Sequence, residues 1–95
     1  LPKFPEVRRD LALLLDEEVT YADLRAAAFR AGKKLLKQVS LFDVYRGDKI
    51  GHGKKQYAMS FVLQDLEKTL TDGDVDRMMS KFLNVFQKEF GAVLR

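Results

Sequence analysis

Residues 41–65, LFDVYRGDKIGHGKKQYAMSFVLQD, contain most of the side chains that could bind a ligand. Two extended runs enclose a loop that holds three glycines, three lysines and the only histidine of the chain. Tyr45 and Tyr57 flank this loop. Such a hairpin could simply reverse the chain, or its cations and aromatic rings could hold a negatively charged partner.

Metal chemistry finds little support in the sequence. One histidine and no cysteine cannot assemble a transition-metal cluster. Asp72, Asp74 and Asp76 alternate as D-x-D-x-D, but the turn glycine and terminal glutamate of a calcium loop do not follow. Their place in the first turn of an expected helix is explained by the helix dipole, so we expect no metal site.

Motifs for nucleophilic catalysis or for phosphate binding at a helix are also missing. Ser40, Ser60 and Ser80 lie in no motif that would pair them with His52. The stretch GDKIGHG leads into an extended run rather than a helix, so its glycines are better explained by turn geometry. The sequence predicts a binding module without a catalytic residue or a cofactor of its own.

The composition is typical of one small globular domain. The chain has 95 residues, of which 46% are hydrophobic and 33% charged, and its net charge of +3 favours nucleic acid only slightly. No run approaches the length of a membrane span, and residues 1–10 lack the pattern of a signal peptide. Because no initiating methionine is present, we expect residues 1–95 to be one domain of a longer protein.

The order of elements predicts a fold. Thr20 and Thr71 are each followed three residues later by an aspartate, which predicts two capped helices, and glycines 32 and 91 would end them. Extended runs predict strands over residues 7–16, 35–45 and 55–64, of which 55–64 alternates well and 35–45 is apolar on both faces. The short run 92–95 could close an edge of the sheet. Strand–helix–strand–strand–helix–strand is the order of an α+β, ferredoxin-like split βαβ domain, with a four-stranded antiparallel sheet and both helices on one face.

The strand pattern assigns side chains to the two faces of this sheet. We expect Phe42, Val44, Tyr57, Met59 and Phe61 to lie under the helices. The uncovered face would then carry Asp43, Tyr45, Gln56 and Ser60, with the Lys54–Lys55 pair at its rim. An aromatic ring, small polar groups and a cationic edge suit a sheet that receives unstacked RNA bases. A bulge in either strand would exchange the faces.

Each of these residues also has an ordinary structural explanation. Adjacent lysines are often only solvated, and a tyrosine at a strand end is often a packed aromatic residue. Arg8 and Arg9 suit a basic rim and a plain surface equally well. The stripe formed by Met78, Met79, Phe82 and Phe86 is expected to be core.

Four segments resemble one known family. KFPEVRRDLALLLDEEV, LFDVYRG, GKKQYAMSFVLQDLEKTLTDGDVD and the final FGAVLR are similar to the ferredoxin-fold anticodon-binding domain, which closes the β chain of bacterial phenylalanyl-tRNA synthetases. The resemblance runs from about Lys3 to Arg95.

The resemblance implies that the uncovered face receives the anticodon of phenylalanine tRNA. Tyr45 would stack on an anticodon base, and Asp43 would bind a base edge, with Ser60 on the same face. Gln56 stands where the family usually has a serine that can contact a base, so this contact would differ.

The backbone of the tRNA would be held by Lys54, Lys55, Arg46 and Arg8. Catalysis with ATP and Mg²⁺ would belong to the α chain of the synthetase. The resemblance therefore implies that the partners are tRNA, the rest of the β chain and the α chain, in a cytoplasmic heterotetramer.

Two other functions fit a ferredoxin-like domain. Its uncovered face could dock another protein during assembly, for which Leu14, Val39 and Leu41 would supply apolar surface. Binding to RNA should weaken steeply with salt, whereas apolar docking should hardly change. A small-ligand regulatory domain is the third possibility, but no pocket-forming group of residues supports it.

Overall fold

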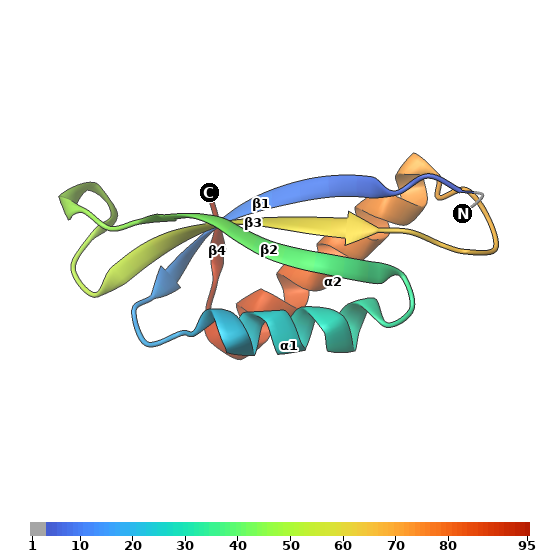
Figure 1. Cartoon of the computed structure of the whole chain (residues 1–95). Coiled ribbons are helices and arrows are strands. Elements are labelled where there is room, and N and C mark those ends of the chain that lie inside the picture. The colour runs from blue at the N-terminus through green and yellow to red at the C-terminus, as the bar shows by residue number, and fades with distance from the viewer. Residues whose placement is uncertain (1–3) are drawn as a thin grey trace.

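The computed structural model describes residues 4–95 and contains two helices packed against one antiparallel sheet (Figure 1). The elements follow the predicted order: β1 (Val7–Asp16), α1 (Tyr21–Gly32), β2 (Leu36–Tyr45), a short 3₁₀ turn (Asp48–Ile50), β3 (Lys54–Leu63), α2 (Asp72–Phe90) and β4 (Val93–Leu94). The strand order is β2-β3-β1-β4, and every neighbouring pair is antiparallel. The predicted ferredoxin-like fold is confirmed.

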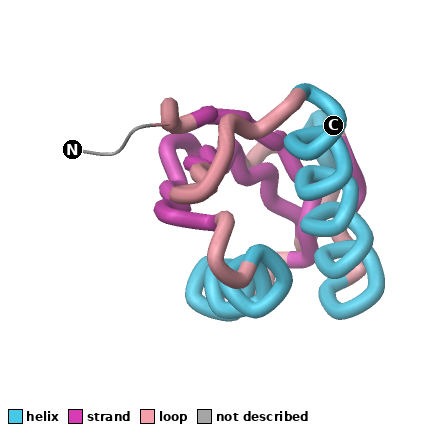
Figure 2. The backbone as a smooth tube through the Cα atoms, turned by 90° about the vertical axis from the view of Figure 1, so that its right-hand side faces the viewer, coloured by secondary structure: helices cyan, strands magenta, loops and turns pink. Residues whose placement is uncertain are grey.

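The two helices lie on the same side of the sheet and differ in direction. In Figure 1, α1 lies below the strands, and α2 passes behind them from the upper right to the lower left. Figure 2 views α1 almost along its axis while α2 is seen from its side. The opposite face of the sheet carries no helix.

The core forms between the helices and the alternate residues of the two central strands. Leu13 and Leu15 of β1 are fully buried or nearly so, as are Met59 and Phe61 of β3. The ring of Phe61 stacks on Phe82 of α2 with a centroid separation of 5.0 Å. Phe82 and Phe86 are core residues as predicted, whereas Met78 and Met79 lie only partly buried beside them.

Both helices begin at the predicted caps. The hydroxyl of Thr20 accepts a hydrogen bond from the amide of Asp23 at 3.1 Å. At α2 the bonds are reciprocal, because the Asp74 amide donates to the Thr71 hydroxyl and the Thr71 amide donates to the Asp74 carboxylate. Each cap satisfies amide groups that the first helical turn cannot pair internally.

The two glycines at the helix ends differ in purpose. Gly91 has a φ of +66° and closes α2 in the left-handed region, as predicted. At the end of α1 the left-handed residue is Lys33, with a φ of +49°, rather than Gly32. A Cβ on Gly32 would lie 2.6 Å from the Cβ of Leu36 and 3.1 Å from the Phe82 ring, so this glycine is required by close packing.

The hairpin of β2 and β3 extends past the helices at one end of the molecule (Figure 1). Its connection holds the 3₁₀ turn, in which Ile50 is buried. Gly51 and Gly53 have φ values of +97° and +71°, a region that residues with a side chain rarely adopt. The loop glycines therefore shape the hairpin, as the sequence indicated. No helix within residues 4–95 is long and apolar enough to cross a membrane.

The different environments of two helical glycines give a matched test of the core. Gly32→Ala should lower the free energy of unfolding by about 1–3 kcal/mol, because the new methyl group overpacks the contact with Leu36 and Phe82. Gly73→Ala in the exposed first turn of α2 meets the flexible end of Arg77 at 3.3 Å and the Thr71 hydroxyl at an ordinary contact distance of 3.8 Å, and it should raise stability by up to about 1 kcal/mol. Urea unfolding followed by circular dichroism measures both, and effects of the same sign and size would contradict this packing.

Candidate nucleic-acid interface

The pairing of β2 with β3 brings four predicted residues to one face. Tyr45 lies opposite Gln56, Asp43 opposite Ala58, and Ser40 opposite Ser60. Cross-strand partners point to the same side of a sheet. The neighbours of these residues on β3 are buried against the helices, so Asp43, Tyr45, Gln56 and Ser60 all lie on the side without helices, which we call the open face.

A β-bulge interrupts the ladder at Phe42. Leu41 pairs with Met59 and Asp43 pairs with Ala58, so β2 has one residue more than β3 at this step. The side chain of Phe42 is 53% exposed, and the Arg8 guanidinium lies 5.8 Å from the centre of its ring. The predicted position of Phe42 under the helices is therefore wrong, because the bulge turns its ring to the open face.

The same bulge decides where the other apolar residues of β2 lie. Val39 pairs with Phe61 and is buried in the core, and Leu41 pairs with Met59 on the same side. The expectation that these two residues make the open face apolar is wrong. Val44 lies opposite Tyr57 on the helix side as predicted, but it is 41% exposed because the hairpin extends past the helices.

Tyr45 is positioned by the glycine that follows it by two residues. A Cβ on Gly47 would lie 2.7 Å from the Tyr45 hydroxyl and 3.0 Å from the ring carbon that carries it. Gly47 has an extended φ of 175°, so the need for glycine here is space rather than backbone conformation. The ring lies close against the Gly47 backbone and is still 43% exposed.

The centre of the open face has a floor of small side chains. Ala12 pairs with Ala58, and Ser60 pairs with Ser40 on one side and Asp10 on the other. At the hairpin end, Gln56 lies between Tyr45 and Leu14. Ser60 is only 4% exposed although it belongs to this face, which means that neighbouring side chains cover it.

Three of the four predicted backbone-binding cations are held by carboxylates. Arg46 binds both oxygens of Glu17, with Nε at 2.8 and 3.0 Å, and Lys54 forms an ion pair with Asp16. Arg8 lies 3.4 Å from a carboxylate oxygen of Asp10. These pairs partly neutralise the rim of the open face.

Lys55 does not lie at the rim. Its side chain is 4% exposed, and its ammonium group lies 4.6 Å from the centre of the Tyr57 ring. Its partner across the ladder is Leu15, a core residue. The prediction that Lys54 and Lys55 form a cationic pair at the rim is therefore wrong for Lys55, since successive residues of a strand point to opposite faces.

The segment after β1 was missed by sequence reasoning, although it holds the hairpin in place. The Glu17 amide donates to the carbonyl of Gly53 at 2.8 Å, beside the Glu17–Arg46 ion pair. The hydrogen bond from Arg46 lowers the pKa of Glu17, and the same bond raises the pKa of Arg46. The antiparallel pairing of β1 with β3 was the available signal, because it places the acidic residues after β1 beside the start of β3.

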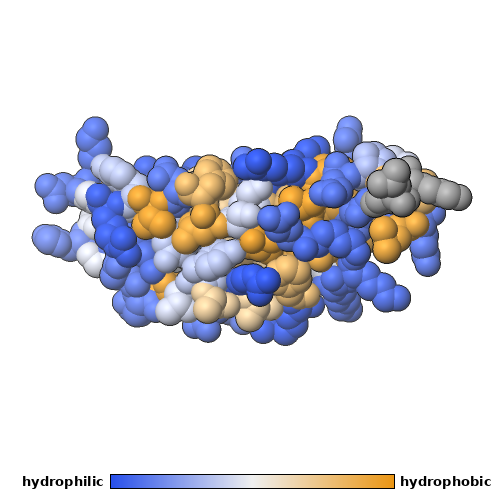
Figure 3. Space-filling model, in the orientation of Figure 1, coloured by the Kyte–Doolittle hydropathy of each residue, from blue (hydrophilic) through white to orange (hydrophobic). Residues whose placement is uncertain are grey.

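Half of the exposed large hydrophobic residues that the structure describes lie on β2, and the others are Leu66 and the two residues of β4. Phe42, Val44 and Tyr45 are all exposed large hydrophobic residues of this strand. Figure 3 shows hydrophobic patches separated by hydrophilic side chains on the side of the molecule that it draws. Isolated rings within a polar surface suit contacts with individual bases better than one continuous apolar interface.

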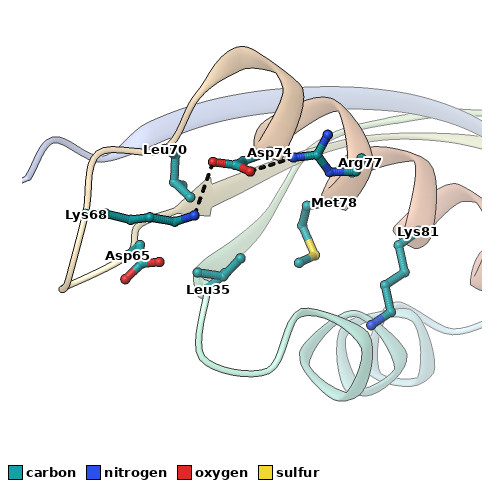
Figure 4. Close-up of a pocket in the computed structure, with 8 residues that line it drawn as sticks. All are labelled: Leu35, Asp65, Lys68, Leu70, Asp74, Arg77, Met78 and Lys81. Atoms are coloured by element: carbon teal, nitrogen blue, oxygen red, sulfur yellow. Dashed lines mark hydrogen bonds and ion pairs between the residues drawn. The ribbon is translucent and has the colours of Figure 1, made fainter.

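A separate hollow of about 270 Å³ lies at the end of the domain away from the hairpin (Figure 4). Asp74 lies on one wall, where Lys68 is 3.7 Å and Arg77 2.6 Å from its oxygens. The pKa of Asp74 is lowered to about 2, chiefly because the Thr71 amide donates a hydrogen bond to its carboxylate, and next because the Thr71 side chain lies beside it. The charges around Asp74 thus belong to the cap of α2. The residues described by the structure contain no group of three or more side chains suited to a metal ion.

Comparisons with known proteins agree with the fold. Residues 2–95 match the family described as the ferredoxin-fold anticodon binding domain. The chain is 52% identical over 95 residues to the phenylalanine--tRNA ligase beta subunit of Bacteroides fragilis. It is 50% identical over 95 residues to the proteins of that name from Porphyromonas gingivalis and Geobacillus kaustophilus. Each alignment covers 100% of this chain but 12% of the relative, so the chain spans a small part of the length of these proteins.

The low pKa of Asp74 predicts an acid-sensitive contribution to stability. Because the pKa falls from 3.8 to about 2 on folding, the contribution is present above about pH 4 and is lost as the pH falls towards 2. Asp74→Asn should lower stability at pH 7 and flatten the decline in the free energy of unfolding between pH 4 and 2. Asp76→Asn, in the same exposed helical turn, is the control and should change that slope less. Urea titrations across this pH range measure both, and an unchanged slope in Asp74→Asn would refute the assignment.

Proposed function

Because this chain belongs to the ferredoxin-fold anticodon-binding domain family, we propose that its open face binds the anticodon of phenylalanine tRNA. The observation that carries the proposal is the shared face of Asp43, Tyr45 and Gln56, with the Tyr45 ring exposed beside them. One aromatic surface and two different hydrogen-bonding groups are what an unstacked base requires.

In this proposal Tyr45 provides the affinity and its neighbours provide the selection. Stacking of one base on the ring contributes about 1–3 kcal/mol. The Asp43 carboxylate accepts hydrogen bonds only, whereas the Gln56 amide can donate and accept. A wrong base would leave one of these groups without a partner, at a cost of about 1–3 kcal/mol. Gln56 reaches further than a serine would, so it can contact a base that lies above the small floor of the face.

Phosphate binding in this proposal is an exchange of partners. Arg46, Lys54 and Arg8 each have a carboxylate neighbour, and these side chains are 42–64% exposed. Exposed ion pairs typically contribute about 0–1 kcal/mol, so a phosphate can replace the carboxylate at little cost. Lys55 is a structural residue in this account, because its ammonium group is buried against Tyr57.

We further infer that the chain acts as one part of a phenylalanine--tRNA ligase, as the name of its relatives suggests. Activation of phenylalanine with ATP and Mg²⁺ would then take place outside these residues, in the α chain of a heterotetramer. The domain would contribute recognition and positioning of the tRNA, and it would work in the cytoplasm, where proteins are synthesised.

A second candidate function is the docking of another protein on the open face. It is favoured by the exposed rings of Phe42 and Tyr45, which could enter apolar pockets of a partner. The small and polar floor between the strands favours RNA instead. The two functions differ in salt dependence, because only RNA binding releases counterions from phosphates.

The anticodon proposal predicts a selective loss in one tyrosine variant. Tyr45→Ala should weaken binding of a phenylalanine tRNA anticodon stem-loop roughly 5- to 150-fold, the equivalent of one lost stacking contact. It should also remove the preference over a loop with a changed anticodon. Leu66→Ala, which truncates an exposed apolar residue between β3 and α2, is the control and should bind like the parent. Fluorescence anisotropy measures both, and retained preference in Tyr45→Ala would contradict the role of this ring.

Single substitutions of Lys54 and Lys55 should have different effects on RNA binding and on stability. Lys54→Ala should reduce the salt dependence of stem-loop binding by about one unit of log–log slope, because one phosphate contact is lost. Lys55→Ala should leave that slope unchanged and lower the free energy of unfolding, because it removes a buried side chain packed on Tyr57. Titrations at several salt concentrations, with urea unfolding of both variants, measure this. Equal salt slopes for the two variants would contradict the assigned positions.

A further inference from the structure

The contact between Arg8 and Phe42 spans the open face. Arg8 lies on β1 and pairs with Val62 of β3. Phe42 lies at the bulge of β2, beside Met59 and Ala58 of β3. Strands β1 and β2 are separated by β3, so their backbones are about 10 Å apart. The guanidinium and the ring can approach to 5.8 Å only by extending towards each other above β3.

The residue of β3 beneath this contact is Ser60. It lies midway in the register between the position of Arg8 and that of Phe42. Its low exposure of 4%, on a face without helices, is explained by this cover. The Arg8–Phe42 pair thus occupies the volume above the small floor in which a base would otherwise lie.

The Phe42 ring has the properties of a base-binding surface. A core role does not account for it, because the ring is 53% exposed and a bulge is required to place it on this side. One side of an aromatic ring that attracts a guanidinium also accepts the flat face of a base. Tyr45 lies three residues further along the same strand and the same face.

We propose that Phe42 is a second base-stacking platform of the open face, and that the Arg8 guanidinium covers it until RNA binds. This inference rests on the proposed function. The two rings of β2 would then receive two different bases of the anticodon loop. A base that displaces Arg8 from the ring also releases a cation, which can turn to a phosphate of the same strand. Asp10 is the carboxylate that holds Arg8 in the free domain.

The test is a double-mutant cycle between the protein and the RNA. Affinities are measured for the 95-residue chain, Phe42→Leu, Phe42→Tyr and Tyr45→Leu, each with the intact anticodon stem-loop and with three loops that lack one anticodon base each. Phe42→Leu should weaken binding of the intact loop at least about fivefold, and this loss should vanish for one abasic loop. Tyr45→Leu should also weaken binding of the intact loop, and its loss of affinity should vanish for a different abasic loop. Phe42→Tyr keeps the ring and should bind like the parent.

Each outcome of the cycle has one meaning. If the loss of affinity in Tyr45→Leu depends on one anticodon base and the loss in Phe42→Leu depends on none, the inference fails and the proposed function stands. If the parent chain does not prefer the intact loop to a loop of changed anticodon, the proposed function fails and the inference with it. Thermal unfolding of Phe42→Leu provides the structural control, since loss of folding would assign the ring to the fold and overturn the platform.

Discussion

The packing of Phe61 decides the direction of the other side chains of β3. Its ring stacks on Phe82 at 5.0 Å and lies 6.2 Å from Phe86, so the centre of β3 is fixed against α2. Because side chains alternate along a strand, Tyr57, Met59 and Leu63 share the buried side, and Gln56, Ala58 and Ser60 have only the open face left. A shift of one residue would bury Gln56 and expose Phe61. The large energetic cost of that exchange keeps Gln56, Ala58 and Ser60 on one surface.

The hairpin end of the open face depends on electrostatic contacts rather than on the core. It extends past the helices, and its cations are held by Asp16, the last residue of β1, and by Glu17, which follows it. These exposed pairs contribute little stability, yet they orient Arg46 and Lys54 before any ligand arrives. The core thus positions Gln56 and Ser60 on the open face, and exposed ion pairs position Arg46 and Lys54 at its hairpin end.

Local signals in the sequence were sufficient to predict the helix caps, the strand β1 and the alternation of side chains along β3. Thr20 and Thr71 bind the amides of Asp23 and Asp74 as expected, since a cap depends on residues three positions apart. The shared face of Asp43, Tyr45 and Gln56 also followed from the alternation of side chains along the ends of β2 and β3.

The errors have physical causes that periodicity cannot reveal. The bulge at Phe42 was hidden because the run that became β2 is apolar on both sides, so an extra residue leaves the pattern unchanged. Lys55 is charged, yet its long side chain lies buried over Tyr57. The role of Gly32 depends on Phe82, fifty residues further along the chain.

The proposed binding of RNA to the open face is tested most directly by the amide chemical shifts of the domain. A ¹⁵N-labelled sample of the chain would be titrated with the phenylalanine tRNA anticodon stem-loop and followed by two-dimensional NMR. The account predicts shift changes concentrated in β2, β3 and the connection between them, with Asp43, Tyr45 and Gln56 among the largest. Changes confined to the outer surfaces of α1 and α2, or to the hollow around Asp74, would contradict it.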